Sequence, residues 1–134
     1  MEIETALKAF LTTQSDVTAL VPASRMFYEF VQNQSVAKPY IVIERTDDPG
    51  THTSDGPVAV GDTGVIIGCY GTTWLSAREV AAAVKAALNG KTGVIGGAGG
   101  ITVNPVFYEN EGSGYDTNVS LYYVDLEFTC QTEG

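Results

Sequence analysis

The sequence predicts an α+β fold in which one antiparallel-rich, mixed β-sheet packs against two main α-helices in a single domain. Apolar residues recur at helical spacing near the N-terminus and again in an alanine-rich stretch that ends at Leu88. Between and after these stretches lie runs rich in β-branched and aromatic residues, separated by turn signals. The length of 134 residues suits one domain with its own apolar core and leaves no room for a second.

The N-terminal part of the chain is expected to contain a helix, a further helical turn and two strands. Residues 2–12 form an amphipathic pattern, and a further turn over 15–20 ends before Pro22. The aromatic-rich segment 25–31 predicts a strand, and a clearer strand follows at Tyr40–Thr46. The apolar face of the first helix comprises Ile3, Leu7, Phe10 and Leu11.

A long turn region, a long strand and the second main helix are expected in the middle of the chain. Residues 47–56 contain strong turn signals, and residues 57–70 predict a strand. Thr72, Thr73 and a capping-box pattern over 76–79 mark a helix start, and Asn89-Gly90 supplies the C-terminal cap of this helix. The buried stripe of this helix is predicted to be Ala77, Val80, Ala81, Val84 and Leu88.

The last third of the chain predicts two more strands. Residues 93–100 hold five glycines and are expected to be a loop or a hairpin tip. A strand over 101–109, a polar turn over 110–118 and a closing strand over 119–130 follow. Alternation in the closing strand places Tyr122, Val124, Leu126, Phe128 and Cys130 on one face and Tyr123, Asp125, Glu127 and Thr129 on the other.

The charge balance argues against nucleic-acid wrapping and against binding to acidic membranes. Seven Lys and Arg residues stand against sixteen Asp and Glu residues, which gives a formal net charge of −9. The basic residues are scattered singly, whereas phosphate binding requires clustered Lys and Arg. An N-terminus rich in acids shows no signal peptide, and no apolar run is long enough to span a bilayer, so we expect a soluble protein. Cys69 and Cys130 are expected to be buried thiols, although a bridge requires a register that the sequence does not reveal.

Two glycine-containing segments resemble nucleotide-binding loops only superficially. Gly90-Lys91-Thr92 matches the end of a phosphate-binding loop, but the motif needs a glycine where Lys85 stands. The tripeptide also follows a helix instead of opening one, so a helix cap explains it better. The segment 93–100 lacks the spacing of a dinucleotide-binding fingerprint and has no helix directly after it.

A solvated surface explains three groups of polar residues better than a catalytic or metal site does. His52 is the only histidine, so a triad or zinc site would depend on one loop imidazole. Glu109 and Glu111 would share a face if their strand continued, as a glycosidase carboxylate pair would. The aspartates considered as calcium ligands lack the spacing of a calcium loop; they are Asp47, Asp48, Asp55 and Asp62. We therefore predict no enzyme activity, no cofactor and no metal.

Amphipathic aromatic residues are the remaining candidates for function. They lie beside predicted loops or on the polar side of strands, where such residues typically anchor interfaces or are simply half-buried. They comprise Tyr28, Trp74, Tyr108, Tyr115 and Tyr123.

The order and spacing of several segments resemble the tail-completion (tail-terminator) protein family of long-tailed bacteriophages and prophages. The resemblance covers essentially the whole chain. Two features depart from the usual pattern: the 93–100 tip is longer, and Gly68-Cys69-Tyr70 stands where a polar residue and Trp are common. The matching segments are the first helix, Val17–Val21, Arg25-Met26-Phe27, Lys38-Pro39-Tyr40-Ile41-Val42, Asp55-Gly56, Gly64–Tyr70, Val84–Gly90, Phe107–Glu111 and Leu121–Phe128.

The resemblance implies a ring, typically of six subunits, at the head-proximal end of the tail tube. Such a ring stops tube polymerisation, offers a docking face to the head-tail connector or other neck proteins, and lets DNA pass through its lumen without specific binding. The expected location is the neck region of the virion tail, with assembly in the host cytoplasm. A ring implies a heterologous interface, for which addition of a strand at a sheet edge is a suitable means. An acidic lumen wall would let DNA slide.

Candidate interface residues come from the loops and loop-flanking strands. The alternatives are another neck ring, either a head-closure or a connector-adaptor protein, and a small ligand-binding or enzymatic α+β domain. The predicted partner-interface residues are Arg45, Asp47, Asp48, His52, Asp55, Tyr108, Glu109, Glu111 and Tyr115.

Overall fold

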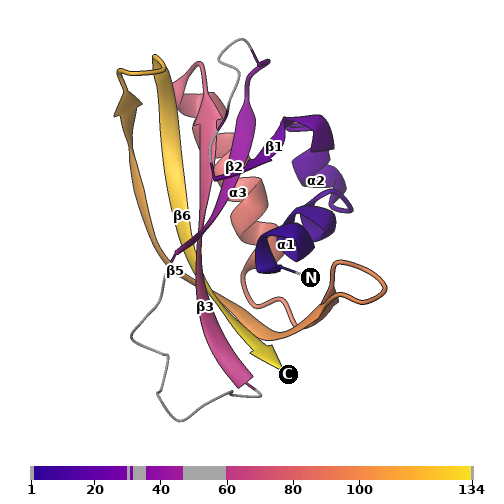
Figure 1. Cartoon of the computed structure of the whole chain (residues 1–134). Coiled ribbons are helices and arrows are strands. Elements are labelled where there is room, and N and C mark those ends of the chain that lie inside the picture. The colour runs from indigo at the N-terminus through magenta and orange to yellow at the C-terminus, as the bar shows by residue number, and fades with distance from the viewer. Residues whose placement is uncertain (1, 30, 32–35, 47–59, 134) are drawn as a thin grey trace.

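A computed structural model describes residues 2–29, 31, 36–46 and 60–133. They form a curled, mixed β-sheet with helices packed on one of its sides (Figure 1), which confirms the predicted α+β class. The strands lie in the order β1-β2-β3-β6-β5-β4. The elements are α1 (Ile3–Leu11), α2 (Ser15–Thr18), the 3₁₀ turn η1 (Ala23–Arg25), β1 (Met26–Tyr28), β2 (Tyr40–Thr46), β3 (Val60–Gly71), α3 (Trp74–Leu88), β4 (Gly93–Ile95), β5 (Ile101–Asp116) and β6 (Leu121–Glu133).

Helices α1 and α3 form where the apolar spacing predicted them. The buried face of α1 comprises Ile3, Ala6, Leu7 and Leu11, while Phe10 is half-buried. The stripe predicted for α3 is buried at every position. Thr73, one of the predicted start signals, is the N-cap of α3, and its hydroxyl accepts a 3.0 Å hydrogen bond from the amide of Ser76. This bond satisfies one of the amides that the first turn of a helix leaves free.

The sheet is mainly antiparallel, with one parallel pair at its edge. β1 runs parallel to β2, and the other neighbouring strands are antiparallel. β3 and β6 form the central pair, in register from Val60 opposite Glu133 to Gly71 opposite Tyr122. Side chains therefore alternate between the face covered by helices and an opposite face, called the open face, on which, of the described residues, only Tyr40, Val42 and Leu121 are buried, within a small apolar cluster.

The main core lies between the helices and the covered face of the sheet. Ile43, Ile67, Leu126 and Phe128 project from the sheet into it. Tyr122, Val124, Leu126, Phe128 and Cys130 share this side, as the alternation predicted, and Tyr122 is only partly buried. Among the described residues, no polar or charged residue is fully buried. Functional polar groups must therefore be sought at the surface.

The predicted boundaries of the last two strands are wrong, whereas the segment 93–100 takes one of the two forms predicted for it. The segment 93–100 begins with the short strand β4, so it is a hairpin tip. β5 continues to Asp116 where a turn was predicted, and β6 begins at Leu121. Pairing with β6 overrides the weak strand propensity of the glycines in this stretch. Gly114 in particular makes room for Tyr123, because a Cβ there would lie 3.0 Å from the tyrosine hydroxyl.

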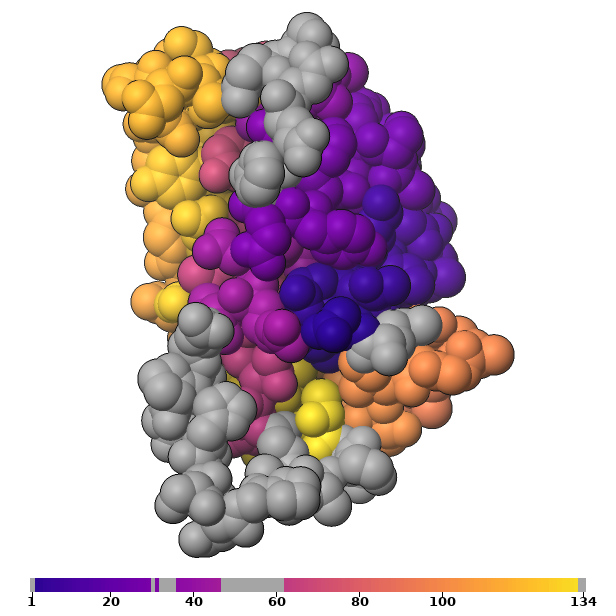
Figure 2. Space-filling view, in the orientation of Figure 1, coloured from indigo at the N-terminus to yellow at the C-terminus, as the bar shows by residue number. Residues whose placement is uncertain are grey.

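The two hairpin tips project at opposite ends of the molecule. Figure 2 shows the β5–β6 tip at the upper left and the β4–β5 tip at the lower right. Cys69 lies opposite Val124, whereas Cys130 lies opposite Thr63, roughly 20 Å away along the strands at about 3.3 Å per residue. Both cysteines are buried free thiols, and a disulfide between them is excluded in this fold.

Candidate functional site

The predicted interface residues fall into two groups. Asp47, Asp48, His52 and Asp55 lie outside the described residues. Arg45, Tyr108, Glu109, Glu111 and Tyr115 are described, and the structure gives them different roles.

Arg45 is engaged within the chain, at the end of β2. Its guanidinium lies 3.0 Å from a carboxylate oxygen of Glu2 and 3.9 Å from one of Glu4. These pairs link β2 to the start of α1. Their side chains are partly exposed, so each pair contributes little to stability, at most about 1 kcal/mol.

Tyr108 and Glu111 also act within the chain, where they join β5 to α3. The Tyr108 hydroxyl donates a 2.8 Å hydrogen bond to one oxygen of Glu111, and Arg78 donates a 2.6 Å bond to the other. The Lys85 ammonium lies 4.0 Å from the centre of the Tyr108 ring. The bonds from Tyr108 and Arg78 lower the pKa of Glu111, and the bond to Glu111 raises the pKa of Tyr108. These bonds hold α3 against β5 at the surface, which is a structural role and not that of an acid–base pair.

Glu109 and Tyr115 remain at the surface. Glu109 is exposed at a bulge between Tyr108 and Asn110, which breaks the alternation that would have paired Glu109 with Glu111. Strand alternation therefore does not assemble Glu109 and Glu111 into the carboxylate pair that was the less favoured interpretation of the sequence. Tyr115 is half-exposed, and its ring meets that of Tyr122 edge-on at 4.9 Å.

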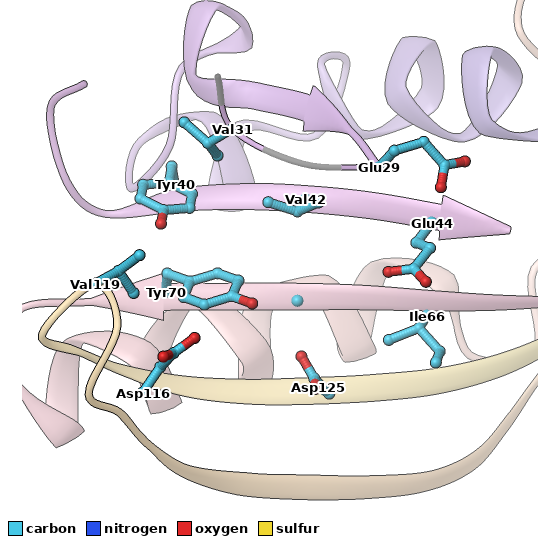
Figure 3. A pocket seen from close by; sticks show the side chains of 11 residues that line it. Glu29, Val31, Tyr40, Val42, Glu44, Ile66, Tyr70, Asp116, Val119 and Asp125 are labelled. Atoms are coloured by element: carbon cyan, nitrogen blue, oxygen red, sulfur yellow. The ribbon is translucent and has the colours of Figure 1, made fainter. Parts of the chain in front are cut away.

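A groove on the open face of the sheet gathers acidic and tyrosine side chains (Figure 3). Its cavity volume is about 270 Å³. The rings of Tyr40 and Tyr70 stack at 5.0 Å along one end of it. The acidic lining residues are Glu29, Glu44, Asp116 and Asp125.

The described residues that line this groove include acidic side chains and no Lys or Arg. Burial, followed by the charges of Glu44 and Glu127, raises the pKa of Asp125. Burial and the nearby Asp125 raise the pKa of Tyr70 to about 12, so the tyrosine stays neutral. The groove repels phosphate and attracts cationic groups.

Gly68 provides the room that Asp125 occupies. A Cβ on Gly68 would lie 3.0 Å from the Asp125 carboxylate and 3.0 Å from the Tyr70 ring. The sequence indicated that Asp125 and Glu127 share the polar face of β6. It gave no sign that Glu29, Glu44 and Asp116 would join them, because that depends on strand order and register.

Replacing Asp125 with asparagine should stabilise the protein at neutral pH. The raised pKa means that the folded state disfavours the ionised carboxylate, so the stability present below the unfolded pKa is lost as pH rises through the folded pKa. Asp125→Asn removes this loss, and we expect a Tm gain of about 1–3 °C at pH 7. The gain should shrink as pH falls towards 4. Thermal melts across this range measure it, with the exposed Glu79→Gln as control; an equal gain in both variants would contradict the assignment.

The described part of the chain offers no metal centre and no membrane helix. In it, no group of three or more His, Cys, Asp or Glu residues is placed to hold a metal ion. None of its helices has the length and apolar character needed to cross a bilayer.

Comparison with known proteins gives one family match and clear structural relatives. The model of the family described as tail completion protein gp17 matches residues 5–133. A chain from the virion of a native gene transfer agent particle has a TM-score of 0.71 at 18% identity, covering 98% of this chain and 95% of the other. A second solved structure has a TM-score of 0.58 at 14% identity, with coverages of 100% and 98%. A search of curated proteins found no match.

Proposed function

Because the chain belongs to the tail completion protein gp17 family, we propose that it forms the ring that terminates the tail tube of a long-tailed phage or prophage. The family is one of virion tail structural proteins, and its match over almost the whole chain is the observation that carries the proposal. The shared fold with a chain of a gene transfer agent virion is consistent with it. The ring would contain six subunits and sit at the head-proximal end of the tube.

The proposed role is mechanical and not catalytic. The ring stops tube polymerisation on one side and presents a docking face to the connector on the filled head. Its partners are further copies of itself, the tail tube protein, and connector or neck proteins. The β4–β5 tip projects from the body of the subunit and carries Gly96, Gly97 and Gly99 at positive φ. The conformational freedom of glycine would let this tip adapt its backbone to a partner.

We assign the open face of the sheet to the lumen wall of this ring. Helices cover the other face, and the open face carries Glu44, Asp116, Asp125 and Glu127. A negatively charged wall repels the phosphates of DNA, so the nucleic acid passes without binding. An experimental ring structure with a basic interior would contradict this assignment.

Blocking expression of the gene tests the proposed function. An amber variant of the phage, grown in a non-suppressing host, should yield filled heads beside unattached tails of irregular and often excessive length. Negative-stain electron microscopy of the lysate measures both features, and growth in a suppressing host is the control. Tails of normal length beside leaking or empty heads would favour the alternative, a head-closure ring. Normal infectious particles would contradict any neck function.

A further inference from the structure

The outer edge of β5 is covered along only part of its length. β4 pairs with β5 at Ile101–Val103 and no further. The segment after α3 covers the next part of this edge. The amide of Val106 donates to the carbonyl of Lys91, and the amide of Tyr108 donates to the side chain of Asn89. Beyond Tyr108, no described strand pairs with this edge as far as Asp116.

The register identifies which backbone groups are left on the open edge. The amides of Val106 and Tyr108 point outward, so their partners on β6, Cys130 and Phe128, are non-hydrogen-bonded positions of the β5–β6 ladder. Non-hydrogen-bonded positions occur at every second residue of β6, so Leu126, Val124 and Tyr122 are the next three such positions. Their partners on β5 therefore direct N–H and C=O outward; they are Glu111, Ser113 and Tyr115.

Residues 110–116 of this edge have no proline, no lysine and no covering strand of the described chain, and the nearest bulge lies before them at Glu109. Natural proteins block such edges with proline, lysine or a covering segment. Gly112, Ser113 and Gly114 leave the backbone of this stretch accessible. An unprotected edge at the rim of an assembling subunit is suited to accept a strand.

We propose that the β5 edge over residues 110–116 pairs with β1 of a second copy of this chain, and that this contact closes the ring. The inference rests on the proposed ring function, because a ring joins two different patches of the same subunit. β1 bounds the opposite edge of the described sheet. It runs antiparallel to β5, since β1 is parallel to β2, β2 is antiparallel to β3, β3 to β6, and β6 to β5. Rotation about an axis along the strands thus brings β5 and β1 together as an antiparallel pair.

Charge complementarity favours the same partner. On the open stretch of β5 the Glu111 carboxylate is already bonded to Arg78 and Tyr108, whereas Asp116 ends the stretch, towards which the start of an antiparallel β1 would lie. Arg25 directly precedes β1, and it forms no ion pair with any residue that the structure describes. Pairing the two edges also joins the sheets of neighbouring subunits around the ring, which leaves their open faces on one side, as the lumen assignment requires.

A proline at Ser113 tests the pairing directly. Proline removes the outward N–H, to which no described strand offers an acceptor, whereas alanine keeps it. In phage whose own gene is amber-blocked, Ser113→Ala supplied in trans should restore plaque titre. Ser113→Pro should lower it by roughly tenfold or more and should be absent from purified tails. The melting temperatures of the two purified proteins should agree within a few degrees.

Each other result overturns the inference. Incorporation and normal titre of Ser113→Pro would show that the edge takes no strand, although the terminator function would stand. An unfolded Ser113→Pro protein would show that this amide bonds within the subunit. Incorporation into tails that fail to join heads would mean that another protein supplies the strand. The amber experiment tests the function separately.

A crosslink tests β1 as the partner. Ser113→Cys combined with Tyr28→Cys should give a ladder of oligomers in purified tails treated with a short bismaleimide. Each single variant is a control, because the native Cys69 and Cys130 are fully buried. If the double variant is incorporated into tails but gives no ladder of crosslinked oligomers, β1 is excluded as the partner strand.

Discussion

Replacing Phe128 with alanine should lower the free energy of unfolding by about 3–5 kcal/mol. Phe128 is 2% exposed on the central strand β6, and its ring meets that of Tyr108 edge-on at 6.0 Å. Removing the ring leaves a cavity between the sheet and the helices that the neighbouring strands, held on both sides by ladder bonds, fill only partly. Because small domains are stable by only about 5–15 kcal/mol, the variant should also express poorly.

Urea denaturation followed by circular dichroism measures this loss. Phe107→Ala is the matched control, since Phe107 precedes Tyr108 on the same strand but is 43% exposed. We expect the control to cost about 1 kcal/mol or less. Equal losses in the two variants would mean that β5 and β6 pack differently from the structure described above.

The sequence predicted those elements whose signals are local. Tyr40–Thr46 follows Pro39 and is rich in β-branched residues, and β2 has the predicted bounds. The alanine-rich stripe of α3 is buried as its 3.6-residue period indicated. Local preference failed at residues 110–116, because glycines that favour turns are held in β5 by their partners on β6. It failed also at β4, which exists only through its pairing with β5.

The candidate site was less predictable, because it depends on strand order. Arg45, Tyr108 and Glu111 were predicted to face partners; the structure shows intrachain contacts for all three, and their role at an interface stays a prediction. A residue's own surroundings in sequence do not reveal such a contact, since Arg78 lies on a helix 33 residues before Glu111. The acidic groove assembles from Glu29 to Asp125 only once β2, β3 and β6 are in register.

Reversing the charge of the open face should produce particles that assemble but release DNA poorly. Glu44 and Glu127 are exposed there, and both raise the pKa of Asp125 through their charges. The double variant Glu44→Lys/Glu127→Lys replaces two carboxylates with two ammonium groups in every copy. If this face lines the lumen, the added cations bind DNA phosphates instead of repelling them. We expect normal tail length and head joining, with infectivity reduced by roughly tenfold or more at low salt.

Salt distinguishes this mechanism from a fault in assembly. Phosphate contacts weaken steeply as salt rises, so ejection triggered in vitro should recover towards wild type between about 50 and 200 mM salt. Glu79→Lys, on the exposed side of α3, adds a cation to the layer that covers the other face of the sheet and should leave ejection unchanged. A defect in Glu79→Lys alone would place the helices at the lumen. Wild-type ejection in both variants would mean that neither face contacts the passing DNA.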